Sequence, residues 1–92
     1  MRAAYRVGVP IDVTLMTRQG CHLCEVARGE LERILPDYGL TARLVDVDTD
    51  AELRAEYGDR VPVVLLNGKE HGYFTVDERR LRPALQALRQ HS

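Results

Sequence analysis

The sequence predicts a single α/β domain, and three observations indicate it. Apolar stretches of strand length alternate with stretches of helical periodicity, an Asn-Gly pair joins two strand-like stretches, and a Cys-x-x-Cys pair stands at the start of the first helical stretch. The 92 residues suffice for one modest core. An apolar fraction of 45% and a charged fraction of 29% are typical of a folded rather than a disordered chain.

The first half of the domain contains two strand-like and two helical patterns. In chain order they are a strand at Ile11 to Met16, a helix from His22 that Pro36 ends, a strand at Thr41 to Val47, and a short helix that stops near Gly58. Thr49 followed by Glu52 has the spacing of a capping box and predicts where this short helix begins. Strand–helix–strand units of this kind predict parallel pairing of the strands, with right-handed crossovers.

The second half begins with the most continuous apolar run, Val61 to Leu66, which is typical of a strand buried on both faces. Asn67-Gly68 then predicts a tight hairpin, with Glu70 to Phe74 as the antiparallel partner strand. Thr75 followed by Glu78 is a second capping-box spacing and opens a final amphipathic helix. The predicted order is therefore β-α-β-α-β-β-α, with helices covering the sheet.

Charge and hydropathy exclude several classes of partner. The formal net charge of -1 offers no strong field for nucleic acid or an acidic membrane surface. No apolar run approaches the roughly 18 residues of a membrane-spanning helix. Residues 1–10 predict an N-terminal extension ahead of a domain at 11–92, without the continuous apolar stretch of a signal peptide. We therefore expect a cytoplasmic protein in a reducing compartment, with no nucleic acid or membrane partner.

The chemistry-bearing motif is Cys21-His22-Leu23-Cys24, which holds both cysteines of the chain. A helix N-terminus carries positive partial charge and free N–H groups, and both stabilise a thiolate at the first cysteine. Because the thiolate is the nucleophile and the second thiol lies close enough to close a disulfide, the motif predicts thiol–disulfide exchange. We expect His22 to be an exposed residue of the first helical turn.

Other uses of a Cys-x-x-Cys pair fit less well. A structural zinc site needs about four ligands, and the remaining histidines form no ligand pair at finger-like spacing. Haem attachment needs a histidine directly after the second cysteine, where Glu25 stands. The compartment and the small loop disfavour an inert disulfide. We expect no metal within one chain. A zinc or iron–sulfur site shared by two chains, each giving Cys21 and Cys24, stays open.

Two further residues are candidates for the same site. Pro62 opens the buried strand, where proline is tolerated only at the first residue. The Val61–Pro62 bond is either cis, which would let the backbone of Val61 pair with an extended thiol substrate, or an ordinary trans bond. Arg18 stands three residues before Cys21 and either stabilises a thiolate, holds a substrate carboxylate, or is a solvated loop residue.

From about Val13 to Leu88 the chain resembles the glutaredoxins of the thioredoxin-like superfamily. The resemblance is carried by the Cys21–Cys24 motif after the first strand, by Val61-Pro62 before the third, and by the hairpin and closing helix that follow. It implies a four-stranded mixed sheet flanked by three helices and a cis bond before Pro62. It also implies Cys21 as nucleophile and Cys24 as resolving thiol. The chain is similar to the short glutaredoxin-like proteins of bacteria.

The chain departs from the glutaredoxin pattern at the glutathione site. Typical members have a lysine before the first cysteine, where Arg18 substitutes, and a Gly-Gly pair after the last strand that binds the γ-glutamyl end of glutathione. Here Tyr73 and Phe74 stand where that pair should be, and side chains there would crowd a close backbone approach. Strand alternation predicts one of these rings in the core and one outside. Thr75 and Asp77 keep part of the glutathione site.

These observations together predict a cytosolic thiol–disulfide oxidoreductase. Cys21 would attack a disulfide of a protein or small-thiol substrate, and Cys24 would resolve the mixed disulfide. Residues 18, 22, 61, 62, 75 and 77 would contribute to substrate or glutathione binding. No bound cofactor is expected, and the electron donor is glutathione or a flavoprotein disulfide reductase. We expect a monomer. The alternative is a binding or redox-sensing module that does not turn over.

Overall fold

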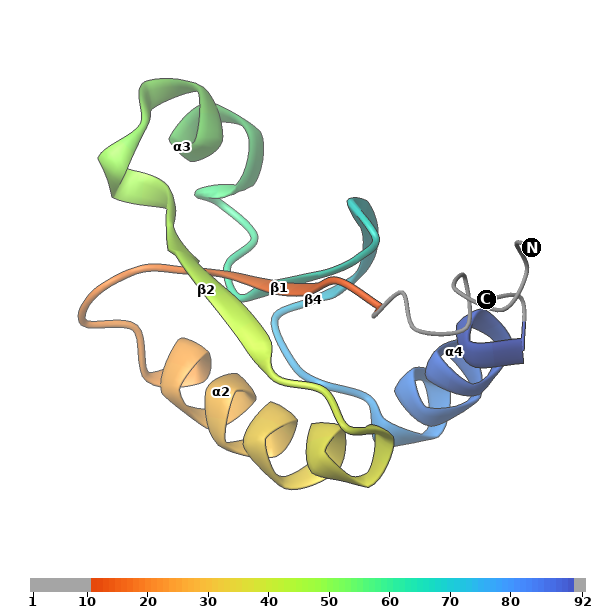
Figure 1. Ribbon diagram of the computed structural model, residues 1–92. Coiled ribbons are helices and arrows are strands. Elements are labelled where there is room, and N and C mark those ends of the chain that lie inside the picture. The colour runs from red at the N-terminus through yellow and green to blue at the C-terminus, as the bar shows by residue number, and fades with distance from the viewer. Residues whose placement is uncertain (1–10, 91–92) are drawn as a thin grey trace.

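The computed structural model describes residues 11–90, and the predicted N-terminal extension at 1–10 lies outside the described residues. The elements follow the predicted order (Figure 1). They are β1 (Val13–Thr17), α2 (His22–Ile34), β2 (Ala42–Asp46), α3 (Ala51–Tyr57), β3 (Val63–Leu66), β4 (Lys69–Tyr73) and α4 (Glu78–Gln90), with 3-10 turns η1 (Leu35–Tyr38) and η2 (Val47–Thr49). Within 11–90 no helix is long and apolar enough to cross a membrane.

The four strands form one mixed sheet in the order β2-β1-β3-β4. β1 and β2 pair in parallel, as predicted, and β3 and β4 form the antiparallel hairpin. The prediction of parallel pairing is wrong for β3, which lies antiparallel to β1. The reason is in the register: Asp46 ends β2 opposite Thr17, and Val63 starts β3 opposite Met16. The connection through α3 therefore stays at one end of the sheet, so β3 runs back in the opposite direction.

The turn between β3 and β4 has the geometry that its sequence predicts. Asn67 and Gly68 both have positive φ, 50° and 84°. Such values suit a two-residue hairpin turn, since Asn and Gly tolerate the left-handed region. Asn67 also exchanges hydrogen bonds with Asp12, through its side-chain oxygen at 2.8 Å and its own N–H at 2.8 Å. The turn is thereby tied to the residue that leads into β1.

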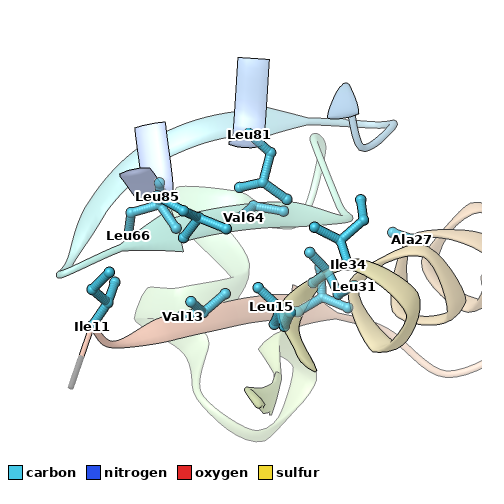
Figure 2. Packing of buried hydrophobic residues seen from close by; sticks show 11 residues of the cluster. Ile11, Val13, Leu15, Ala27, Leu31, Ile34, Val64, Leu66, Leu81 and Leu85 are labelled. Atoms are coloured by element: carbon cyan, nitrogen blue, oxygen red, sulfur yellow. The ribbon is translucent and has the colours of Figure 1, made fainter. Parts of the chain in front are cut away.

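The core lies on both faces of the sheet. α2 and α4 cover one face, where Leu31 and Ile34 of α2 and Leu81 and Leu85 of α4 point toward the sheet (Figure 2). The strands meet them with Val13, Leu15, Val64 and Leu66. α3 covers the opposite face, over a smaller cluster of Met16, Val47, Val63 and Leu65. All four residues of β3 are buried, which confirms the prediction for the apolar run.

The helix starts correct two predictions, while Pro36 ends α2 as predicted. Asp50, not Thr49, caps α3, since its carboxylate accepts the N–H groups of Glu52 at 2.7 Å and Leu53 at 3.4 Å. Asp77, not Thr75, caps α4, where its Oδ1 accepts the N–H of Arg79 at 3.0 Å. In both places an aspartate closer to the helix offers a charged acceptor in place of the threonine hydroxyl. α2 ends at Ile34, so Pro36 lies in the following 3-10 turn.

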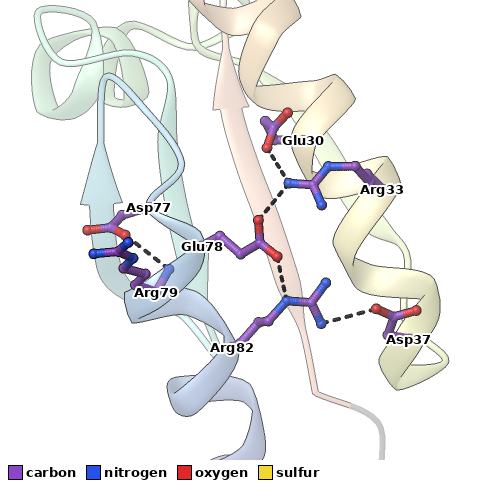
Figure 3. A network of polar contacts seen from close by, with 7 residues as sticks. All are labelled: Glu30, Arg33, Asp37, Asp77, Glu78, Arg79 and Arg82. Carbon is purple, nitrogen blue, oxygen red and sulfur yellow. Dashed lines mark hydrogen bonds and ion pairs between the residues drawn. The ribbon is translucent and has the colours of Figure 1, made fainter.

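A polar network joins the first turn of α4 to α2 (Figure 3). The Glu78 carboxylate accepts hydrogen bonds from Arg33 of α2 at 2.8 Å and from Arg82 of α4 at 2.7 Å. Arg33 also pairs with Glu30 at 2.6 Å, and Arg82 with Asp37 at 3.0 Å. These arginines, Arg33 first, lower the pKa of Glu78 to about 2. The network ties the end of the chain to the helix that carries the cysteines.

Candidate functional site

Cys21 occupies the N-cap position of α2. Its backbone is extended, with φ -102° and ψ 109°, and its carbonyl accepts the N–H of Glu25 at 3.2 Å. Its Sγ accepts the N–H of Cys24 at 3.2 Å, in the way that a serine or aspartate oxygen caps a helix. The sulfur therefore lies at the positive end of the helix dipole. It is also partly exposed, so it can meet a substrate.

Cys24 lies one turn further along α2 and is buried, with 1% of its surface exposed. Both cysteines are free thiols in this structure. Burial, and then the hydrogen bond with Cys21, raises the pKa of the Cys24 thiol, while the Thr17 hydroxyl and the backbone of Arg18 act in the opposite direction. The two thiols therefore differ in environment: the first is accessible at a helix end, and the second is buried one turn further along the helix, with a raised pKa.

Arg18 is bound within the fold, although 37% of its side chain stays exposed. Its guanidinium forms two hydrogen bonds of 2.9 Å with the Asp48 carboxylate and one of 3.2 Å with the carbonyl of Gly58. The bond to Arg18 is the main cause that lowers the pKa of Asp48. The hydrogen bonds to Asp48 raise the pKa of Arg18, with a smaller contribution from Cys21. Arg18 therefore ties the loop before Cys21 to η2 and α3.

Sequence reasoning missed Asp48 and Gly58 as supports of this loop. Two other aspartates of the acidic run at 46, 48 and 50 act as caps: Asp46 accepts the N–H of Asp48 at 2.9 Å, and Asp50 accepts the N–H of Glu52 at 2.7 Å. Gly58 has no substitute: a Cβ there would lie 2.5 Å from the carbonyl oxygen of Arg54. The signal available in the sequence is Asp48, the middle aspartate of the run, which caps no helix.

The Val61–Pro62 bond is cis, as the resemblance implies. The pair directly precedes β3, with Pro62 buried and Val61 partly buried. The Pro62 carbonyl accepts the N–H of Phe74 at 2.8 Å. This bond links the start of β3 to the residue that follows β4. His22, next to Cys21, is exposed as predicted.

The prediction that one ring of Tyr73 and Phe74 enters the core is wrong. Both are exposed, by 50% and 44%, and the rings meet edge to face with centroids 4.9 Å apart. Phe74 has φ 67°, in the left-handed region, which breaks the alternation of the strand. This conformation costs a residue with a Cβ roughly 1–2 kcal/mol. The side chains therefore project from the end of β4 into solvent.

The remaining predicted residues, Thr75 and Asp77, lie at the start of α4. With His71 and Arg80 they line an open cavity of about 520 Å³ on the side of β4. Within residues 11–90, neither Thr75 nor Asp77 hydrogen-bonds to a cysteine, and Arg80 has no ion pair. The same part of the chain holds no group of three or more His, Cys, Asp or Glu side chains that could bind a metal.

A mixed four-stranded sheet with a Cys-x-x-Cys pair at the first helix start and a cis-proline before the third strand defines a thioredoxin-like domain of the glutaredoxin type. The chain belongs to the family described as the glutaredoxin-like domain (DUF836), whose model matches residues 12–86. It is 47% identical over 76 residues to the uncharacterized protein Rv0508 of Mycobacterium tuberculosis, covering 77% of this chain and 78% of that protein.

Solved structures agree with the fold. Protein Ne2328 from Nitrosomonas europaea superimposes with a TM-score of 0.75 and 26% identity, over 84% of this chain and 93% of the other. Glutaredoxin C1 from Populus tremula x tremuloides superimposes with a TM-score of 0.52 and 25% identity, over 86% and 83% of the two chains. The resemblance to glutaredoxins and the β-α-β-α-β-β-α fold predicted from the sequence are thereby confirmed.

Proposed function

We propose that the protein is a thiol–disulfide oxidoreductase in which Cys21 is the nucleophile and Cys24 the resolving thiol. The observation that carries the proposal is the contrast between the two sulfurs. Cys21 is partly exposed and its Sγ accepts the Cys24 N–H at 3.2 Å, while Cys24, one turn further along α2, is buried. An accessible sulfur at a helix N-terminus suits attack on a disulfide, and a sheltered thiol one turn away suits the second step.

The reaction balances as a two-electron exchange. The Cys21 thiolate attacks one sulfur of a substrate disulfide, that S–S bond breaks, and the leaving sulfur takes up a proton. Cys24 then loses its proton and attacks the Cys21 sulfur of the mixed disulfide. The second substrate thiol leaves, and Cys21 and Cys24 are joined in a disulfide. The substrate has gained two electrons and two protons, which a donor must return to the protein.

The partners follow from this chemistry. The substrate is a disulfide in a protein or a small thiol compound, and the donor is glutathione or a flavoprotein disulfide reductase. The backbone of Val61 would hold the substrate chain, and Thr75 and Asp77 would contact a small thiol. We propose that the protein works as a monomer in the cytoplasm, where reduced thiols prevail.

The test uses the reduced protein, freed of reductant, and a peptide with an internal disulfide. We expect free peptide thiols to appear together with a Cys21–Cys24 disulfide, both measured by mass spectrometry after acid quenching. Cys21→Ser should abolish both products while its circular dichroism spectrum stays unchanged. Equal reduction by native protein and Cys21→Ser would contradict the proposal.

A second candidate function is a binding or redox-sensing module without turnover. The observation that favours it is the set of apolar side chains exposed around the site, Leu23 at 44% and Tyr73 at 50%. Such a module would keep its partner when Cys21 is replaced by Ser. Loss of the biological effect in Cys21→Ser, with fold and partner binding intact, would exclude this candidate.

A further inference from the structure

Phe74 adopts a backbone conformation that its residue type disfavours. Of the described residues other than glycine, only Asn67 and Phe74 have positive φ, and Asn67 lies in a hairpin turn where asparagine is favoured. A residue that has a Cβ avoids this region. Burial of the ring does not compensate for the cost, because 44% of Phe74 is exposed. Strain kept at an exposed position points to a function for the side chain.

The strand register places Phe74 at the reactive end of the sheet. Tyr73 lies opposite Val63, and Val63 lies opposite Met16, one residue before the end of β1. Neighbouring strands are roughly 5 Å apart, so the end of β4 lies about 10 Å from the strand that leads into the cysteine loop. The bond from the Phe74 N–H to the Pro62 carbonyl, 2.8 Å, holds Phe74 beside the strand between them.

Exposed apolar side chains lie at this end of the sheet, where Tyr73 also lines the cavity that contains Arg80. The Tyr73 and Phe74 rings form an edge-to-face pair that is half exposed, and Leu23 of the cysteine motif is exposed as well. Arg18 is held by Asp48 and Gly58. Such a surface complements an uncharged apolar side chain. Glutathione instead carries two carboxylates, and side chains at 73 and 74 crowd the close backbone approach that would bind one of them.

We propose that Tyr73 and Phe74 are specificity-determining residues, which contact an apolar side chain next to the reacting cysteine of a protein disulfide and disfavour mixed disulfides of glutathione. The inference rests on the proposed oxidoreductase function and names its substrate class. The occupant of the Tyr73–Phe74 pair is an extended protein segment, and its apolar side chain is the group the rings contact.

The experiment compares second-order rate constants of the reduced native protein with three disulfides. Two are peptides that differ only in having leucine or glycine beside the disulfide cysteine, and the third is a mixed disulfide of glutathione with 2-mercaptoethanol. We expect the leucine peptide to react about tenfold faster than the glycine peptide, since one apolar contact gives discrimination of this order. Phe74→Gly should remove most of this preference and raise the rate with the glutathione disulfide.

A matched control separates the ring pair from apolar surface in general. Leu44 of β2 is exposed by 44%, as Phe74 is, but lies on the opposite edge strand. Leu44→Gly should leave the leucine-to-glycine ratio of the native protein unchanged. Tyr73→Gly should lower the ratio, and Phe74→Ala should lower it although it keeps a Cβ at the position.

The outcomes distinguish this inference from the function on which it rests. Equal rates for both peptides in the native protein would overturn the inference and leave the oxidoreductase function intact. A faster reaction with the glutathione disulfide that Arg80→Gln abolishes would also overturn it, because the cavity beside β4 would then bind a carboxylate. Failure of the native protein to reduce any of the three disulfides would overturn both.

Discussion

The start of α2 and the end of β4 lie at the same end of the sheet, but local conformational preferences are satisfied at the first and violated at the second. At the start of α2 every local preference agrees: an extended N-cap residue, a side chain that accepts an N–H, and a helical stripe packed on the core. At the end of β4 a phenylalanine adopts a left-handed backbone, and two aromatic rings project into solvent. Natural chains concentrate such local conflicts where function requires them.

The comparison separates the region of the proposed chemistry from the region of the proposed substrate selection. The cysteine end needs only a strand, a loop and a helix start, and these supply a reactive thiol whatever the substrate. The Tyr73–Phe74 pair has no part in that chemistry but lies at the same end of the sheet. On the two proposals above, reactivity resides in the first region and selectivity among disulfides in the second.

The largest effect is expected at the cysteine end, from Cys24→Ser. Without the buried thiol the mixed disulfide on Cys21 cannot be resolved, so turnover of a peptide disulfide should fall to the uncatalysed background. The peptide should stay attached to the protein, as a mass increase equal to the peptide. Cys21→Ser is the control and should show no adduct. A Cys24→Ser variant that turns over at the native rate would assign resolution to an external thiol.

The next effect contrasts stability at the two ends. Leu31 of α2 is 1% exposed and packs on the sheet, so Leu31→Ala should lower the free energy of unfolding by roughly 2–5 kcal/mol. Phe74→Ala removes a larger side chain but one that is exposed, and should change stability by less than about 1 kcal/mol. Urea denaturation followed by circular dichroism measures both. Similar losses in the two variants would show that the Phe74 ring is held by packing.

The sequence predicted the first region well because its rules are local. The cysteine spacing, the helical stripe and Pro62 at the start of an apolar run each act within a few residues, and the Asn67-Gly68 turn requires no partner elsewhere. The order of elements and the buried third strand followed from the same patterns. Resemblance to the glutaredoxins added the cis bond before Pro62, which the base rate of cis-proline alone does not support.

What the sequence could not give depends on contacts between distant residues. The pairing of Arg18 with Asp48 joins residues 30 positions apart, and periodicity carries no information about it. The direction of β3 depends on where the α3 connection lies in space, and strand–helix–strand rules assume that it spans the sheet. Period-2 alternation failed at Phe74 because it assumes an extended backbone, and the left-handed φ there ends the strand.

A glycine comparison sharpens the contrast in backbone strain. At position 74, Gly should be more stable than Ala by roughly 1 kcal/mol, since only Gly adopts the left-handed region without strain. Gly29, in the middle of α2, has nothing within 4 Å of a Cβ built on it, so Gly29→Ala should instead stabilise the protein by about 1 kcal/mol. Midpoints of urea denaturation measure both differences. The same sign at both positions would contradict the left-handed conformation of Phe74.

The smallest effect concerns the network that holds α4 against α2. The hydrogen bonds from Arg33, and then from Arg82, lower the pKa of Glu78 from its usual 4.5 to about 2. Because the unfolded chain binds the proton more tightly, the contribution of Glu78 to stability is present above pH 4.5 and is lost as the pH falls toward 2. The melting temperature of the native protein should therefore decline more steeply across this range than that of Glu78→Gln, and the two curves should converge at the acid end. Other carboxylates titrate in both proteins, so the difference between the curves isolates Glu78. Parallel curves would mean that solvent screens the network and that apolar packing alone, through Leu81 and Leu85, joins α4 to the rest of the domain.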